Sequence, residues 1–337
     1  MTNKQRYKEF CGTQADLPLM LQWWWMDAVC AGKDWDALLF TARELEVRTV
    51  APDTVVAAMP YLIRRRAWVK YILMPQLTQT GGVWMDELLL QNEKAQQLLV
   101  QLLRDRLRKM HLYYYQQSYP MGSPIPELLQ QFRRFTLLEH VTYNVRDLSD
   151  MANVVSSFSK NKQRQLKKAE SLQVDFDMTG EELFTFIRRS LTERMRRPAY
   201  SREFLLVLER KAARYQCGQI IRLTDGVSRS DGTIERRTVA AAFVVWDNKR
   251  LYYLVPAFLS SAGNNGASAR LVVEAMKIAA ERGLIFDFEG GNDPGIRNHY
   301  SQFGAEQTAY WIVTRSYRPL FSLALRINKW RERHIWK

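Results

Sequence analysis

The sequence is poor in cysteine. Its 337 residues include only three cysteines, Cys11, Cys30 and Cys217, which are far apart and form no CxxC pair. An odd number of widely spaced cysteines supports neither a disulfide framework nor a zinc site. The pattern is typical of a reducing compartment, so we expect a cytoplasmic protein without a bound metal ion.

Long apolar segments and secretion signals are also missing. The N-terminus, residues 1–6, is polar, and no apolar run reaches the roughly 20 residues that a bilayer-spanning helix needs. We therefore expect no signal peptide and no membrane-spanning helix. Any contact with a membrane is expected to be peripheral, at its inner face.

Several well-known catalytic signatures are absent as well. The chain contains no GxSxG, no HExxH, no Walker loop and no recognisable Ser-His-Asp signature. It therefore gives no support to covalent or metal-assisted catalysis. If the chain transfers a group, we expect one substrate to attack the other directly.

Positive charge is abundant. Lys and Arg total 49 against 35 Asp and Glu, a formal net charge of +14, and 47% of the residues are apolar. The apolar share is ordinary for a folded protein with a sizeable core, and the length suits two domains. The charge favours an anionic partner such as RNA, a lipid surface or a phosphorylated precursor, with simple solubility as the alternative. Nothing indicates DNA.

The first 145 residues alternate between helix and strand patterns. Residues 23–30 form an aromatic-rich helix, in which at least two of the three tryptophans are expected in the core. Leucines recur at helical spacing over residues 91–109. We predict strands at residues 37–40, 55–63, 71–74, 111–116 and 135–143.

The second half is organised around residues 253–315. These predict a strand, the glycine-rich turn Gly263-Asn-Asn-Gly-Ala-Ser268, a helix over 271–280 and a short buried strand at 284–288. A glycine-rich turn before a helix presents backbone N–H groups beside the positive end of the helix dipole, which suits a phosphate. Antiparallel strands at 220–224, 239–246 and 251–255 precede it.

Residues 149–171 predict a strongly basic helix. At 3.6 residues per turn, Lys160, Arg164, Lys167 and Lys168 share one side. Such a strip can neutralise several phosphates, although a charge run is more often just a solvated face. A second basic cluster, Arg188-Arg189 and Arg194-Met-Arg-Arg197, follows a helix with a capping box from Thr179 to Glu182.

Two acids interrupt the apolar strand at 284–288. Asp287 and Glu289 alternate with Phe286 and Phe288, so we expect both acids on one face, opposite the phenylalanines. A carboxylate in an apolar strand tends to have a raised pKa, which suits a general base or an ammonium anchor; pairing with an arginine is the alternative.

Two tyrosines near these acids are further candidates. Tyr253 and Tyr300 could protonate or orient a leaving group, although each is more often a packing residue. We take Asp287, Glu289, Tyr300 and Tyr253 as the candidate catalytic residues.

Four motifs carry a resemblance to a known family. They are Asp287-Phe-Glu-Gly-Gly, Pro294-Gly-Ile, Phe303-Gly and the earlier Asn161-Lys-Gln-Arg-Gln-Leu-Lys-Lys-Ala-Glu. Together they resemble the Fem-type branch of the GNAT acyltransferase superfamily, clearly over residues 140–315 and less before. The resemblance implies an α/β (α+β) protein with two GNAT-like domains in tandem, each a mixed, mostly antiparallel sheet flanked by helices.

The resemblance also sets the expected domain limits. We place an N-terminal GNAT-like domain at residues 1–145 and a C-terminal one at 146–316. Residues 317–337 predict a basic helix with tryptophans that packs back on the N-terminal domain or, alternatively, lies at an anionic membrane surface.

Donor and acceptor contacts follow from the same resemblance. The implied donor phosphate site comprises Lys160, Asn161, Arg164, Lys167, Lys168, Gly263, Gly266, Ala267 and Ser268, and the implied acceptor contacts are Gln76, Thr78, Gln79 and Thr80. A polar turn is an equal alternative for the acceptor loop. The chain departs from the GNAT pyrophosphate signature, because Gly263 stands where Gln or Arg is usual and Ser268 where Gly or Ala is usual.

Three functions are compatible with these features. The first is acyl or aminoacyl transfer from acyl-CoA or aminoacyl-tRNA to an amine of a cell-envelope precursor, such as the peptidoglycan precursors used by the best-known Fem-type enzymes. Residues 179–215 are too short for the long helical arm of the tRNA-dependent members. The second is CoA-dependent N-acetylation of a small amine, and the third is non-catalytic binding of RNA or a lipid surface.

Overall fold

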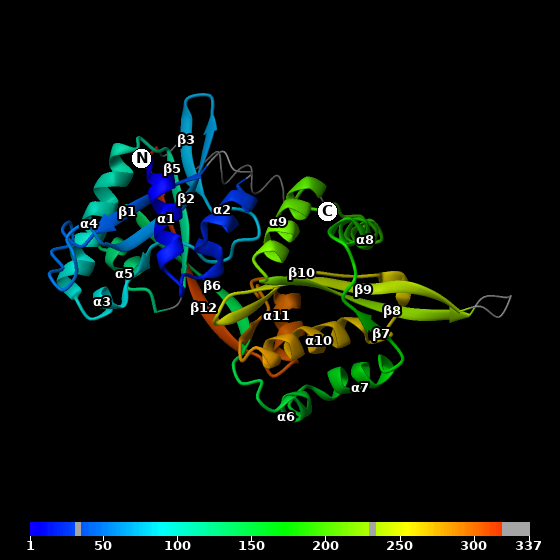
Figure 1. The fold of residues 1–337 in the computed structure, drawn as a ribbon. Coiled ribbons are helices and arrows are strands. Elements are labelled where there is room, and N and C mark those ends of the chain that lie inside the picture. The colour runs from blue at the N-terminus through cyan, green and yellow to red at the C-terminus, as the bar shows by residue number, and fades with distance from the viewer. Residues whose placement is uncertain (31–34, 121, 229–233, 319–337) are drawn as a thin grey trace. The chain divides into compact units, whose positions relative to one another are not determined.

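The computed structural model describes residues 1–30, 35–120, 122–228 and 234–318, and its elements are labelled in Figure 1. The chain divides into two compact units, residues 1–140 with 309 onward, and residues 141–308. Each unit contains strands of a mixed, mostly antiparallel sheet flanked by helices, which confirms the predicted fold class. The helix predicted at 317–337 lies almost wholly outside the described residues.

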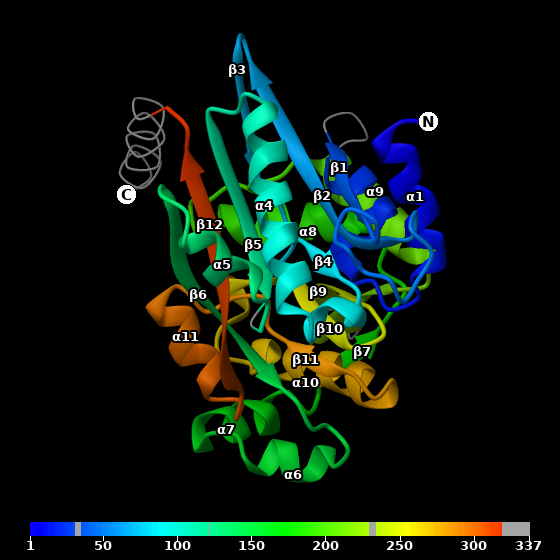
Figure 2. The same ribbon diagram turned by 90° about the vertical axis from the view of Figure 1, so that its left-hand side faces the viewer.

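The first unit contains the strand order β1-β2-β3-β5-β12, with β4 paired to β2. Its strands are β1 (Trp35–Thr41), β2 (Val55–Arg66), β3 (Val69–Leu73), β4 (Trp84–Met85), β5 (Tyr114–Pro120) and β12 (Glu306–Ser316, from residue 309 on). Its helices are α1 (Asn3–Thr13), α2 (Trp23–Val29), α3 (Glu87–Leu90), α4 (Glu93–Lys109) and α5 (Ile125–Gln130). Figure 2 shows α4 running across the face of this sheet.

The core of the first unit follows the sequence pattern. Leu99, Leu103 and Leu107 are buried along one side of α4, which confirms the predicted leucine stripe. Trp24 and Trp25 are buried in α2, which confirms the prediction that at least two tryptophans are core residues. Burying each of these leucine side chains stabilises the folded protein by about 1.5 to 3 kcal/mol relative to leaving it exposed.

The second unit has the strand order β6-β11-β10-β9-β8-β7. Its strands are β6 (Phe135–Val145, from residue 141 on), β7 (Gln173–Asp175), β8 (Gly218–Ser228), β9 (Ile234–Trp246), β10 (Arg250–Phe258) and β11 (Ile285–Asp287). Its helices are α6 (Met151–Ser156), α7 (Lys160–Lys168), α8 (Gly180–Thr192), α9 (Arg202–Arg214), η2 (Ser260–Ala262), α10 (Ala267–Glu281) and α11 (Pro294–Ser301). In Figure 1, α8 and α9 lie on one face of these strands and α10 and α7 on the other.

Two strands of the second unit separate where the predicted acids lie. β10 and β11 are parallel and pair only as far as Tyr252 and Asp287, where β11 ends. β10 continues to Phe258, paired with β9 alone, after a shift of register between Tyr252 and Val255. The edge of β10 beyond Tyr252 therefore has backbone groups that no described strand pairs.

The basic helix predicted over residues 149–171 is two helices, so that prediction was wrong in this detail. α6 ends at Ser156, and Ser159 then caps α7 by accepting a hydrogen bond from the N–H of Lys162 at 3.3 Å. Serine favours such caps over helix interiors because its hydroxyl bonds nearby backbone groups. Between the helices, Phe158 is buried edge-on against Phe303, with ring centroids 5.2 Å apart.

Helix α7 packs tightly against the start of α10. Gly266, which precedes α10, has a left-handed backbone with φ of +76°, and a Cβ there would lie 1.9 Å from the carbonyl oxygen of Gln165. Only glycine tolerates both the conformation and the close approach. Gly266 therefore has a packing role in addition to any role in binding.

This contact predicts different costs for two glycine substitutions at opposite ends of α10. Gly266→Ala should destabilise the protein more than Gly283→Ala, because Gly283 is also left-handed but a Cβ there meets nothing within 4 Å. The left-handed backbone costs about 1 to 2 kcal/mol in either variant, and displacing α7 should add a further 1 to 3 kcal/mol in Gly266→Ala, roughly. Urea denaturation measures both, and equal losses would contradict the packing role.

Candidate functional site

A buried acid, Asp287, lies at the end of β11. Its side chain accepts hydrogen bonds from the hydroxyl of Thr142 at 2.6 Å and from the N–H of Glu289 at 2.9 Å. Nη1 of Arg250 lies 3.3 Å from its other oxygen and also donates to Asn144 at 3.1 Å. The alternative raised from the sequence, pairing with an arginine, is thus realised for Asp287.

The sheet brings these groups together. β6 runs antiparallel beside β11 with Asn144 opposite Asp287, and alternation in β6 puts Thr142 on the same face as Asn144. β10 runs parallel on the other side and begins at Arg250, opposite Ile285. Three adjacent strands therefore supply one polar cluster inside an apolar sheet.

The second acid, Glu289, is held in an unusual way. It lies beyond the end of β11 with φ of +56°, a left-handed conformation that is uncommon for residues other than glycine. Its Oε1 atom is buried and has no hydrogen-bond partner among the described residues. Strain and an unpartnered buried atom in one residue are typical of functional positions. Because β11 ends at Asp287, the predicted strand alternation does not extend to Glu289.

The two acids differ in their protonation. Burial raises the pKa of Glu289 well above 4.5, and the nearby charge of Asp287 raises it further, while Arg250 lowers it. Burial also raises the pKa of Asp287, but the hydrogen bonds from Thr142 and Glu289 and the charge of Arg250 oppose this. Since Asp287 has the partners that stabilise a carboxylate, a proton shared by the pair resides on Glu289.

A second buried atom without a partner lies in the same cluster. Asn144 is 0% exposed, and its Oδ1 accepts the hydrogen bond from Arg250. Its Nδ2 has no acceptor in the part of the chain that the structure describes. Leaving a buried donor unsatisfied costs about 1 to 3 kcal/mol, which a bound substrate oxygen would recover.

Aromatic residues form one wall of this cluster. Tyr300, from α11, stacks on Phe288 with ring centroids 4.2 Å apart, and burial raises its pKa to about 12. Its hydroxyl is therefore protonated at neutral pH. Tyr253 is 4% exposed and packs against Phe286 and Phe288 in the core.

A buried lysine joins α7 to α11. Lys162 is 2% exposed, and its Nζ lies 3.0 Å from Nδ1 of His299 and 3.2 Å from Oε1 of Gln165. It also lies 4.8 Å from the ring centroid of Phe303. No carboxylate of the described chain pairs with it, and burial lowers its pKa to about 8.

The predicted donor residues lie around this helix. Lys160, Asn161, Arg164, Lys167 and Lys168 are all exposed on α7. In the predicted turn, Gly266 and Ala267 are buried, Ser268 is half-buried and Gly263 is exposed. The structure thus brings α7 and the turn together. The residues that face Gly266 are Gln165 of α7 and Ala169, however, and not the predicted cations, so a carbonyl oxygen lies beside Gly266.

The predicted acceptor residues belong to the first unit. Thr78 is buried, accepts a hydrogen bond from Nε1 of Trp25 at 3.0 Å and donates to the carbonyl of Gln76. Gln79 accepts from Ser118 through its carbonyl, and its side-chain Nε2 is buried without a described partner. Gln76 is exposed and Thr80 half-buried.

Sequence reasoning missed Thr142, Asn144, Arg250 and Lys162 as members of the site. Thr142 and Asn144 carried a signal, since they alternate with Val141, Tyr143 and Val145 in an otherwise apolar strand. Arg250 and Lys162 carried none, because their roles depend on strand pairing and on the burial of one side of α7.

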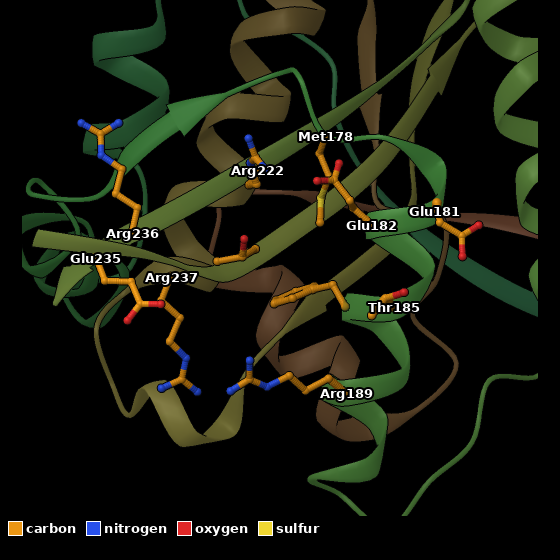
Figure 3. A pocket seen from close by; sticks show the side chains of 11 residues that line it. Met178, Glu181, Glu182, Thr185, Arg189, Arg222, Glu235, Arg236 and Arg237 are labelled. Carbon is orange, nitrogen blue, oxygen red and sulfur yellow. The ribbon is translucent and has the colours of Figure 1, made fainter.

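A separate pocket of about 720 Å³ lies between α8 and strands β8 and β9. Figure 3 shows the arginine and glutamate side chains that line it. Within the described ranges, no group of three His, Cys, Asp or Glu side chains is arranged to hold a metal ion. Nor does any described helix have the length and apolar character needed to cross a membrane.

Residues 156–300 match the model of a family described as an acetyltransferase (GNAT) domain. No curated protein sequence matches the chain significantly. The crystal structure of FemX matches with a TM-score of 0.66 and 12% identity, covering 92% of this chain and 96% of FemX. The structure of L-PGS from Bacillus licheniformis matches with a TM-score of 0.53 and 11% identity, covering 96% of each chain.

A third solved structure has a related name. It is the C-terminal domain of a putative lysylphosphatidylglycerol synthetase from Agrobacterium fabrum, with a TM-score of 0.50, 13% identity and coverage of 93% of this chain and 91% of that one. Identities this low show a shared fold. Together with the domain match over residues 156–300, they support an acyltransferase with the fold of the GNAT superfamily. Within that superfamily the chain has the Fem-type fold, as the resemblance of its motifs implied.

The buried lysine predicts a pH-dependent stability. Lys162 has a pKa of about 8 in the folded protein and 10.5 in the unfolded chain. Between these values the unfolded chain binds more protons, so stability should rise with pH from 8 to 10.5, by on the order of 2 to 3 kcal/mol. Lys162→Met should remove that rise and be more stable than the parent at pH 7.

Chemical denaturation at several pH values measures this effect. Lys160→Met is the matched control, because Lys160 is exposed on the same helix. It should keep the parental pH dependence. If Lys162→Met and Lys160→Met showed the same dependence as the parent protein, Lys162 would not be a destabilising buried amine.

Proposed function

We propose that this protein transfers an aminoacyl group from aminoacyl-tRNA to the amine of a phosphorylated cell-envelope precursor, with Glu289 as the general base. The observation that carries the proposal is the buried, unpartnered Oε1 of Glu289 beside Asp287, where β10 and β11 separate. Acyl transfer in general follows from the acyltransferase domain; the donor, the acceptor and the roles of individual residues are the proposal.

The first step needs an amine without its extra proton. An ammonium group approaching Glu289 would lose a proton to the carboxylate, and a base with a raised pKa accepts it more readily than an ordinary glutamate. The neutral nitrogen would then attack the ester carbonyl carbon. Asp287 remains ionised, since Thr142 and Arg250 hold it, and so keeps Glu289 basic.

The second step needs stabilisation of an oxyanion and a proton for the leaving group. Nδ2 of Asn144 and the unpaired edge of β10 beyond Tyr252 offer N–H donors for the negative oxygen. As the carbon–oxygen bond to the ribose breaks, Tyr300 would donate its proton to the ribose oxygen, and its phenolate would take up the second proton that the attacking nitrogen must lose to become an amide. Its raised pKa keeps that proton available at neutral pH. Tyr253 is assigned a packing role.

Two observations favour an RNA ester over a CoA thioester. The carbonyl oxygen of Gln165 lies beside Gly266, where it would repel the pyrophosphate that this turn binds in other GNAT proteins. The exposed cations of α7 suit a longer phosphate backbone. For the acceptor, support comes from the net charge of +14 and from the shared fold with a protein named for a phospholipid product.

Replacing the proposed base should abolish activity but not folding. Glu289→Gln should lower kcat/KM by about 10²- to 10⁴-fold, the usual contribution of a general base. Its melting temperature should be retained, because glutamine resembles the protonated carboxyl group. The assay follows loss of radiolabelled aminoacyl groups from tRNA to a panel of primary amines.

The pH dependence of the same assay gives a second readout. A base must be deprotonated, so the parental rate should rise with pH through a pKa well above the ordinary 4.5 of glutamate. Glu289→Gln should lack this rise, whereas the exposed control Glu281→Gln should keep it. Parental turnover in Glu289→Gln would refute the assignment, and binding of RNA without any turnover by the parent would favour a non-catalytic protein.

A thermal-shift panel tests the donor. Bulk tRNA at low salt should raise the melting temperature, because a ligand that binds only the folded state stabilises it, and added salt should weaken the effect. CoA and acetyl-CoA should not. Stabilisation by CoA compounds alone would instead support CoA-dependent N-acetylation of a small amine, the candidate favoured by the description of the matched domain.

A further inference from the structure

The pocket between α8 and the strands β8 and β9 has two arginines close together at one end. Arg189 of α8 and Arg237 of β9 both line it, and in Figure 3 their guanidinium groups point toward one another. Like charges that converge in this way repel, unless an anion lies between them. The second basic cluster of the sequence, which contains Arg189, therefore faces a cavity.

Arg237 is hydrogen-bonded to the short helix η2, and Arg189 is connected to it through an ion pair with Glu193. Nη2 of Arg237 donates to the hydroxyl of Ser261 at 2.9 Å, and that hydroxyl donates to Glu193 at 2.7 Å. Nε of Arg189 lies 4.0 Å from the same Glu193 oxygen. Arg194 also reaches this helix, through Ser260 at 3.2 Å. Arg194 and Arg237 thus bond to η2 directly, whereas Arg189 is connected to it only through Glu193.

Glu193 does not provide acceptors for all the N–H donors of these arginines. Its two oxygens accept from the N–H and the hydroxyl of Ser261, at 3.0 and 2.7 Å. A guanidinium group has five N–H donors, and Nε of Arg237 is buried without a partner in the described structure. The arginines therefore have more N–H donors than the described residues around them have acceptor oxygens.

The other acids of the pocket have partners of their own. Glu181 forms an ion pair with Arg202, and Glu182 accepts from the N–H and hydroxyl of Thr179 in the capping box. Glu235 also has an interaction partner. Another arginine of the lining, Arg222, is paired with Asp175 at 2.8 Å.

We infer that this pocket is a binding site for a phosphate ester, held between Arg189 and Arg237. A phosphate has the charge and the oxygens that two guanidinium forks can bind at once, whereas a single carboxylate would saturate only one fork. Phe186 and Met178 give the pocket an apolar side against which the organic part of the ester can pack. The site goes beyond the proposed function, because it requires no turnover and shares no residue with the acid cluster.

Calorimetric titration with inorganic pyrophosphate at low salt tests the site. The parent protein should bind, and Arg189→Gln and Arg237→Gln should each weaken binding by roughly tenfold to a hundredfold. Arg188→Gln is the matched control, because Arg188 neighbours Arg189 on α8 and lies outside the pocket lining. It should bind as the parent does.

Conservative variants keep the test independent of folding. Arg237→Lys retains the charge and loses the planar fork, so it should bind more weakly than the parent but more tightly than Arg237→Gln. Melting temperatures show whether each variant is folded. Equal weakening in Arg188→Gln, or no binding by the parent, would overturn the inference.

Two probes distinguish the source of the phosphate. A ribotrinucleotide CCA stands for the end of a tRNA, and CoA stands for a nucleotide thioester donor. Displacement of pyrophosphate by either one supports the site and identifies its ligand class. Binding of both probes that is unchanged in Arg189→Gln and Arg237→Gln would show that they bind elsewhere, against the inference.

Discussion

The burial of Asp287 within the sheet is the constraint on which the second unit depends. A carboxylate taken out of water is stable only with partners, and three neighbouring strands supply them: Thr142 from β6, Arg250 from β10 and the backbone just after β11. The same arrangement leaves the half-buried Glu289 beside a negative charge, with a buried Oε1 that has no partner among the described residues. One acid thus has partners that stabilise its carboxylate form, and the other acquires the raised pKa that acid–base chemistry at neutral pH needs.

The helices around this sheet place the remaining groups. Gly266 lets α7 approach α10 closely, and the same helix α7 places Lys162 against His299 of α11. The next residue of α11, Tyr300, stacks on Phe288. In the sequence, Phe288 lies between the two acids, Asp287 and Glu289. A buried amine without a carboxylate partner costs stability, and Lys162 also forms a contact between α7 and α11. The packing of the basic helix α7 therefore contacts the same helix, α11, that positions Tyr300 in the aromatic wall.

Local patterns were enough to predict much of this fold. Three features could be recognised in the sequence because each depends on residues that are close together in it. They are the leucine stripe of α4, the capping box at Thr179 and the glycine turn before α10. Asp287 and Glu289 were identified from two acids in an apolar strand. Their difference was not, since it arises from partners over a hundred positions away in β6 and from the left-handed backbone at Glu289. The break at Ser159 and the burial of Lys162 were missed because charge spacing alone does not show which side of a helix packs.

The central claim is that Glu289 is an unpartnered carboxyl group whose pKa is raised by burial and by the neighbouring charge of Asp287. Carbon-13 NMR of side-chain carboxyl groups over a range of pH, with Glu289→Gln to assign the signal, measures its pKa in the folded protein. The account predicts that the Glu289 signal titrates well above 4.5, and that the Asp287 signal moves with it as a coupled neighbour. A Glu289 signal that titrates near 4.5, independent of Asp287, would contradict it.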